Sequence, residues 1–403
     1  MIKGDTAKLR ELMSERDLDA LMAFSPGNMQ YLVGYQAPAL ILKVMGAYSA
    51  LLPANASHAP ALVVGEFDAQ WAKHMSSIDD VKTLGLWVEI EDVEALRNGT
   101  TTERPKREQF DWDQVFSHLR STLRERDLLN GRVGCELESL PGYFRERLEA
   151  EFDDVTWVDA SALYHEAAER KSPEEIAALR RSVELTETGL RASLLDNDPR
   201  GKTVSQLRNE FDLAVRAAVA ADPELEGYQE SRAFITCGGT IGPNVGRNAT
   251  LVEDGCVIWI DCGVTVDGYQ ADFGRTIAVG DVDPLVHLIA EALVAGGQAG
   301  TEKLGIGVPM NEVFEATQAA IRANGLPTYT RGHFGHAIGV GGGEHHPFIS
   351  PTETKTFEPG MAFAYERPFY VRGLGGFQFE DDFVVTENGI ENLNSLPCTL
   401  LRV

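Results

Sequence analysis

The segment from Trp259 to Thr276 constrains the fold of this chain more than any other. Its sequence, WIDCGVTVDGYQADFGRT, places two apolar, β-branched runs on either side of an Asp267-Gly268 dipeptide. Asp-Gly between two such runs is the strongest short-range signal for a β-hairpin. The sequence therefore predicts a hairpin with its turn at this dipeptide.

Two acidic residues, Asp261 and Asp272, lie on opposite arms of the predicted hairpin. Strand pairing can bring their carboxylates to one end and one face, whereas the neighbouring Cys262 should point to the other face. Two carboxylates a few ångströms apart repel each other, and a divalent cation between them removes that cost. A solvated hairpin with ordinary surface acids is the alternative, because Asp is common beside turns. The hairpin alone leaves both interpretations open.

The length of 403 residues is sufficient for two domains, each with its own core. A new helix is expected after Arg170, because Ser172 suits an N-cap, Pro173 suits the first helical position and Glu175 completes a capping box. We therefore expect an α/β domain over residues 1–167 and a second domain over residues 168–403.

The first of these domains shows alternating strand and helix patterns. Ser25-Pro-Gly-Asn28 is a cluster of turn residues. The predicted strands are Ala20–Phe24, Leu40–Val44, Ser49–Leu52, Ala61–Val64, and short runs beginning at Val133 and Val155; the predicted helices are 6–16, Phe110–Arg126 and Gly142–Phe152. In the second domain, helices are expected over Val204–Ala221, Pro284–Leu304 and Met310–Asn324.

The net charge of −25 argues against binding to nucleic acid or to an anionic membrane surface. No apolar run is long enough to cross a bilayer, and the first residues lack the apolar region of a signal peptide. The five cysteines have no Cys-x-x-Cys spacing, which predicts reduced thiols. These features together predict a cytoplasmic protein.

Three further segments carry polar residues within or beside apolar strands: His336 in Gly335–Gly339, Glu366 at the end of Phe363–Glu366, and Glu380 after Phe377–Phe379. Each has an ordinary explanation alone, such as a hydrogen-bonded core histidine or a solvated strand end. As a set with the two aspartates they are different, because a buried acid without a partner is costly. Oxygen and nitrogen donors without thiolate suit Mn, Co, Zn or Fe. Four carboxylates would be neutralised by two divalent ions, which can activate a water and polarise a carbonyl.

The order and surroundings of these five residues resemble the creatinase/prolidase/methionine aminopeptidase metallohydrolases, which have the pita-bread fold. Asp261 begins Asp-x-Gly, Asp272 follows eleven residues later, His336 lies in Gly-His-x-x-Gly, and Glu380 begins Glu-Asp before Val-Thr-Glu-Asn-Gly. Leu18-Asp-Ala-Leu with the following Ser25–Tyr35 resembles the family's creatinase-type N-terminal domain. The implied fold is that α/β domain followed by an α+β catalytic domain with a curved antiparallel sheet.

The resemblance also implies an activity: hydrolysis of Xaa-Pro peptide bonds, with a dipeptidase favoured over an aminopeptidase. In this picture two divalent ions are bound, manganese being the first expectation and zinc, cobalt or iron the alternatives. Asp261 binds one ion, Asp272 and Glu380 bridge both, and His336 and Glu366 complete the coordination of the second ion. Glu366 also acts as general base for a water that bridges the ions. A homodimer and a small peptide or small-molecule substrate are expected.

The residues that would face the substrate depart from the family pattern. A catalytic histidine is expected some residues after His336, where His345 is the first choice and His346 the second, with a substrate-binding role for His346. Asn244 stands where a histidine is common, and Gln378 stands where an arginine is common. These departures keep a second possibility open: a hydrolase or lyase of the same fold that acts on a small non-peptide compound, as creatinase, ectoine hydrolase and a sulfonium-compound lyase do.

Overall fold

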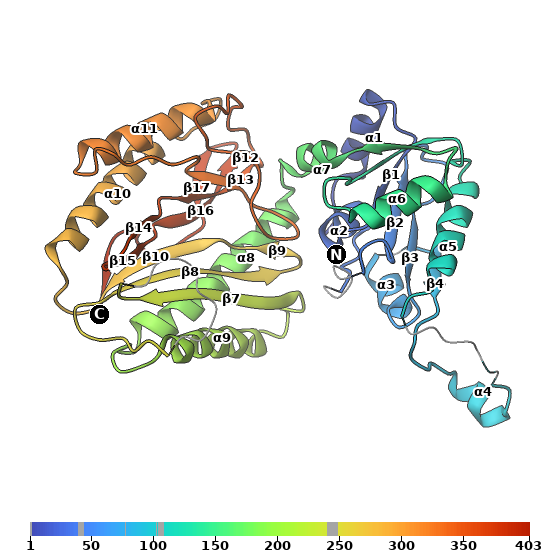
Figure 1. The fold of residues 1–403 in the computed structure, drawn as a ribbon, viewed down its shortest axis with the longest axis horizontal. Helices are drawn as coiled ribbons and strands as arrows, with labels where there is room; N and C mark the ends of the chain where they lie inside the picture. Colours follow the sequence, from blue (N-terminus) through green and yellow to red (C-terminus); the bar gives the residue numbers. More distant parts are fainter. Residues whose placement is uncertain (1, 39–43, 77, 102, 104–108, 240–248) are drawn as a thin grey trace. The chain divides into compact units, whose positions relative to one another are not determined.

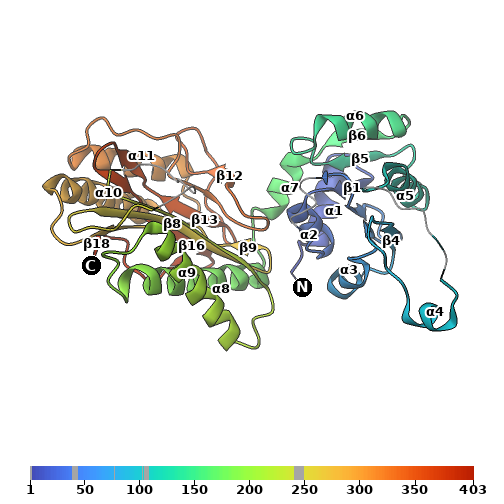
Figure 2. The same cartoon turned by 60° about the horizontal axis from the view of Figure 1, so that its bottom comes forward.

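A computed structural model describes residues 2–38, 44–76, 78–101, 103, 109–239 and 249–403. The chain divides into two compact units, Met1–Ala168 and Glu169–Val403, so the division falls one residue after the expected boundary. Helices pack against a β-sheet in each unit (Figures 1 and 2). Among the described residues, no helix is both long enough and apolar enough to span a membrane.

The first unit contains a six-stranded mixed sheet with the order β4-β3-β2-β1-β5-β6. Its strands are β1 (Ala20–Ala23), β2 (Ser49–Pro53), β3 (Ala61–Gly65), β4 (Val81–Leu84), β5 (Arg132–Cys135) and β6 (Thr156–Asp159). Every residue of β1, β2 and β3 is buried, as expected for strands that are covered on both faces. The predicted strand at Leu40–Val44 falls on residues 39–43, which lie outside the described residues, and on Val44, which is not in a strand.

The helices of this unit are α1 (Thr6–Glu15), α2 (Pro26–Val33), α3 (Ala69–Ser76), α4 (Val93–Asn98), α5 (Trp112–Arg124), α6 (Gly142–Glu151) and α7 (Ser161–Ala168). The expectation of a simple turn at Ser25–Asn28 is wrong. Ser25 is instead the N-cap of α2, its side chain accepts a hydrogen bond from the Asn28 amide, and Pro26 takes the first helical position. Ser and Pro serve helix starts as well as turns, so the local pattern did not distinguish them.

The second unit is built on a ten-stranded curved sheet, mostly antiparallel, with the main order β12-β11-β13-β16-β10-β8-β7. The strands are β7 (Tyr228–Cys237), β8 (Val257–Val266), β9 (Tyr269–Gln270), β10 (Phe273–Ala278), β11 (Gly335–Ala337), β12 (His345–Phe348), β13 (Ala362–Glu366), β16 (Glu380–Thr386), β17 (Gly389–Asn392) and β18 (Leu401–Arg402), with β14 (Phe369–Val371) and β15 (Gly375–Phe377) forming a separate pair. The helices are α8 (Pro173–Leu190), a π-helical segment (Arg191–Leu195), α9 (Val204–Ala221), α10 (Pro284–Lys303) and α11 (Met310–Ala323).

The predicted start of α8 is confirmed, because Ser172 and Glu175 form a reciprocal capping box and Pro173 opens the helix. The apolar residues of the unit form two clusters against the sheet. One joins α10 and α11 to β13 and β16, and the other joins α8 and α9 to β7, β8 and β10. Cys262 belongs to the second cluster, so the neighbouring Asp261 is presented on the opposite face of β8. The five cysteines are free, and the expected two-domain fold class with a curved antiparallel sheet is confirmed.

Candidate metal centre

The predicted hairpin forms around a turn in which both Asp267 and Gly268 have positive φ, 51° and 82°. Val266 pairs with Tyr269 directly across this turn, and further along Gly274 pairs with Asp261. Positive φ at both central residues is the type of turn that fits the twist of paired strands. The pairing brings Asp272, just before β10, to the same region of the sheet as Asp261.

The other candidate ligands arrive through neighbouring strands. Glu380 on β16 pairs with Gly274 of β10 on one side and with Glu366 of β13 on the other. His336 lies on β11, which pairs with β13. The five predicted ligands therefore lie on or beside five consecutive strands of one sheet, β11-β13-β16-β10-β8.

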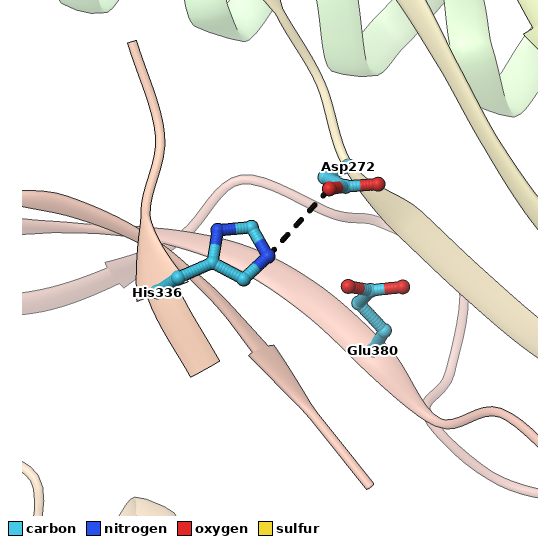
Figure 3. A group of neighbouring side chains, drawn as sticks. All are labelled: Asp272, His336 and Glu380. Atoms are coloured by element: carbon cyan, nitrogen blue, oxygen red, sulfur yellow. Dashed lines mark ion pairs between the residues drawn. The ribbon is translucent and has the colours of Figure 1, made fainter. Parts of the chain in front are cut away.

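Three of these five residues converge on one point. Asp272, His336 and Glu380 each offer a ligand atom within 4.8 Å of the others, and His336 Nε2 lies 3.7 Å from Asp272 Oδ2 (Figure 3). The other ring nitrogen of His336, Nδ1, lies 3.2 Å from the Ala337 carbonyl oxygen, which can only accept a hydrogen bond. With the proton on Nδ1 this contact is a hydrogen bond, and Nε2 then presents its lone pair to the two carboxylates, as in a histidine that binds a metal.

The raised pKa values of the buried acids indicate that their negative charges lack a compensating cation. Burial, together with the charge of Asp272, raises the pKa of Asp261 to about 8. Burial also raises the pKa of Asp272, and burial with the charge of Asp272 raises that of Glu380 well above its ordinary value. Asp261 Oδ1 is buried and has no hydrogen-bond partner within the described part of the chain. Facing carboxylates of this kind fit a cation, and their oxygen and nitrogen donors fit a divalent metal of the Mn, Zn, Co or Fe class.

Gly274 makes the room for this arrangement. A Cβ atom on that residue would lie 2.1 Å from Cγ of Gln378 and 2.8 Å from Oε2 of Glu380. Gln378, predicted to bind substrate, donates from Nε2 to Glu366 Oε2 at 3.2 Å and to Glu380 Oε2 at 2.8 Å. Its amide is thus committed to two of the candidate ligands.

The predicted catalytic histidines lie on β12, the edge strand beside β11. His345 pairs with Ala337, the neighbour of His336. The ring of His346 packs edge-on against Phe348, with centroids 4.7 Å apart. Asn244, the remaining predicted substrate residue, lies outside the described residues. The catalytic and substrate-binding roles of these residues stay predictions.

Four residues that the sequence did not single out also contact the ligands. Arg331 Nη2 lies 3.0 Å from Glu366 Oε1, and His333 Nδ1 lies 3.7 Å from the same oxygen. Burial opposes ionisation of Glu366, but Arg331 and His336 outweigh it and lower the pKa of that carboxyl. Asp382 Oδ2 accepts a hydrogen bond from the Asp272 amide at 3.0 Å.

The fourth is Arg232 on β7, whose Nη2 lies 2.9 Å from Asp272 Oδ1 and 3.7 Å from Asp261 Oδ1. Strand alternation is the signal that could have found it. Arg232 and Phe234 share one face of β7, and Phe234 pairs with Asp261. The position of Arg232 beside Asp261 depends on the β7–β8 register, which local sequence does not predict.

Comparison with known proteins agrees with this arrangement. Residues 177–387 match the model described as metallopeptidase family M24, and residues 6–167 match the creatinase/prolidase N-terminal domain. The uncharacterized peptidase YqhT of Bacillus subtilis is 27% identical over 275 residues, which cover 67% of this chain and 74% of that protein.

Solved structures have the same fold along nearly the whole chain. The Xaa-Pro dipeptidase from Bacillus anthracis superposes with a TM-score of 0.78 at 18% identity, covering 99% of both chains. The prolidase from Thermococcus sibiricus superposes with a TM-score of 0.79 at 17% identity, covering 99% of this chain and 98% of its own. At such identity the likeness shows the fold.

Proposed function

The chain belongs to metallopeptidase family M24, and on that premise we propose that it is a metal-dependent dipeptidase that cleaves Xaa-Pro bonds. The similar structures that are described as an Xaa-Pro dipeptidase and a prolidase support this substrate class. The two-domain architecture supports it as well, because the creatinase/prolidase N-terminal domain precedes the M24 region in the chain.

The convergence of Asp272, His336 and Glu380 is the observation that carries the proposal. These side chains, with Asp261 and Glu366 beside them, would hold up to two divalent ions, with manganese expected first. A bound divalent ion would supply an activated water as nucleophile and would polarise the carbonyl that is attacked.

The remaining steps fall to the chain's own side chains. Glu366 is the general base, and it takes the proton of the attacking water on a carboxylate oxygen. Arg331 and Gln378 support this role, because their contacts favour the ionised form of Glu366 and fix its orientation. His345 stabilises the developing oxyanion or passes a proton to the leaving nitrogen, and His346 and Asn244 contact the substrate.

Hydrolysis of a panel of Xaa-Pro dipeptides by the purified protein tests this function. With Mn²⁺ present, proline release is expected from some members of the panel and not from matched dipeptides that lack proline. Absence of proline release from a protein that retains bound Mn²⁺ would refute the substrate class while leaving the metal centre in place.

A second candidate, turnover of a small non-peptide compound, is favoured by the environment of Gln378. This amide is neutral and donates to two metal-ligand candidates, so it brings no positive charge toward a substrate carboxylate. A panel of small amidino and cyclic amide compounds, assayed beside the dipeptides, distinguishes the two. Turnover of such a compound without dipeptide cleavage would favour the second candidate.

The homodimer and the cytoplasmic location stay predictions. Size-exclusion chromatography with light scattering tests the first, and fractionation of cells that express the protein tests the second.

A further inference from the structure

The side chain of Arg232 lies where a cation is needed. Its Nη2 atom is 2.9 Å from Asp272 Oδ1 and 3.7 Å from Asp261 Oδ1, so one guanidinium nitrogen faces both acidic arms of the hairpin. Asp272 Oδ2, the other oxygen of the same carboxylate, faces His336 instead. Asp272 is therefore divided between two cation positions, and a guanidinium fills one of them.

Packing holds Arg232 in this position. The guanidinium lies over the ring of Phe234, 5.0 Å from its centroid, and the side chain is only 30% exposed. Its Nε atom is buried and, among the described residues, has no hydrogen-bond partner. Guanidinium remains charged at every accessible pH, so the positive charge cannot leave by losing a proton.

The net charge of the site also favours a single divalent ion. Asp261, Asp272, Glu366 and Glu380 together carry −4 when ionised. Arg232 contacts two of them and Arg331 contacts a third, Glu366, at 3.0 Å. Two guanidiniums reduce the excess to −2, which one divalent ion neutralises. The remaining donors converge on one point without an arginine contact there. They are His336 Nε2, Asp272 Oδ2 and Glu380, and this set suits a single ion.

We propose that Arg232 occupies the second cation position, so that the chain binds one divalent ion tightly, at Asp272, His336 and Glu380, and a second ion only when Arg232 is displaced. This inference rests on the metal centre of the proposed function but not on its substrate. A second ion placed between Asp261 and Asp272 would meet the positive charge of Arg232 at contact distance, and like charges at that distance repel strongly.

Counting bound ions tests the proposal. The full chain is stripped with a chelator, equilibrated with micromolar Mn²⁺, separated from free ion by gel filtration and analysed by elemental mass spectrometry. One ion per chain is expected for the wild type and two for Arg232→Gln. Calorimetric titration should show the dissociation constant of the second ion falling at least tenfold in the variant.

Two further variants make the test specific. Arg232→Met keeps the aliphatic stem over Phe234 and should also retain two ions, which covers the case that the glutamine variant folds poorly. Arg180→Gln removes a guanidinium that pairs with Glu391 on the surface, so it should retain one ion.

The outcomes separate cleanly. Two ions in the wild type, no ion in the wild type, or one ion in both well-folded Arg232 variants would each overturn the inference. The expected ion counts without dipeptide cleavage would uphold it and would refute the proposed substrate alone.

Discussion

Both units of the molecule bury acids against a sheet, but they treat them differently. In the first unit, Glu136 is 1% exposed, and its Oε1 atom accepts hydrogen bonds from the amides of Phe24 and Ser25, each at 2.7 Å. In the second unit, Glu380 is 2% exposed and faces other carboxylates, with the Gln378 amide donating to it at 2.8 Å.

The partners of the two acids distinguish a structural carboxylate from a candidate metal ligand. Glu136 joins the end of β1 to the start of α2, because its oxygen supplies the acceptor for the buried Phe24 amide and the part-buried Ser25 amide. Burial raises the pKa of both carboxyls, so a raised pKa alone does not mark function. Convergence does: Glu380 has Asp272 and His336 directed at the same point, an arrangement that a bound cation would stabilise.

The replacement Asp272→Asn should have the largest effect, because it removes a carboxylate from the metal centre. Loss of one anionic donor that faces both cation positions should lower kcat/KM on a cleaved substrate at least ~10³-fold, about 4 kcal/mol in the barrier, and Mn²⁺ should be lost on dialysis. Elemental analysis and initial rates measure the two effects. The surface change Asp198→Asn serves as control, and wild-type metal content and turnover in Asp272→Asn would contradict the metal-centre assignment.

The complementary change in the first unit is Glu136→Ala. The Phe24 and Ser25 amides lose their acceptor, so the free energy of unfolding should fall by about 3 kcal/mol, as measured by urea denaturation. Glu136→Gln keeps a carbonyl acceptor and should lose less. The number of bound Mn²⁺ ions should be unchanged in both, and a lower ion count in folded protein would show that the two acids do not differ as described.

Lys171 is a buried cation, and the acids near it only partly offset the effect of burial on its pKa. Burial lowers the pKa of Lys171 from 10.5 to about 8, although Glu175 and Glu169 act in the opposite direction. Between these two values the unfolded chain binds more protons than the folded chain, so stability rises with pH.

The wild type should therefore gain about 3 kcal/mol of unfolding free energy relative to Lys171→Met between pH 8 and pH 10.5. Parallel denaturation series at several pH values measure this difference, in which the titrations common to both proteins cancel. If the difference in unfolding free energy between wild type and Lys171→Met stays constant across this pH interval, Lys171 is not desolvated in the folded protein.

The smallest effect is expected for the replacement Gly274→Ala. An alanine there needs Gln378 to move, because the added Cβ would lie 2.1 Å from its Cγ. We expect a loss of about 1 kcal/mol in stability and roughly tenfold weaker Mn²⁺ binding, since second-layer contacts orient ligands. Gly142→Ala is the matched control, as its Cβ would meet nothing within 4 Å. Unchanged affinity in Gly274→Ala would mean that the packing around Gln378 does not shape the site.

Local sequence predicted much of this molecule correctly. The turn at Asp267-Gly268 and the helix start at Ser172 depend on backbone preferences and hydrogen bonds that span a few residues, and both formed as expected. The start of α2 at Ser25 was not predicted, because Ser and Pro have the same local preferences in a turn and in a helix cap.

The kind of centre this protein can hold follows from local sequence, since the donor types and their strand settings are chemical properties of the residues. Tertiary structure alone decided that Asp272, His336 and Glu380 share one point and that Arg232 faces Asp261 and Asp272. These contacts depend on the register of strands that are distant along the chain. A shift of one residue in that register would turn every side chain of a strand to its other face.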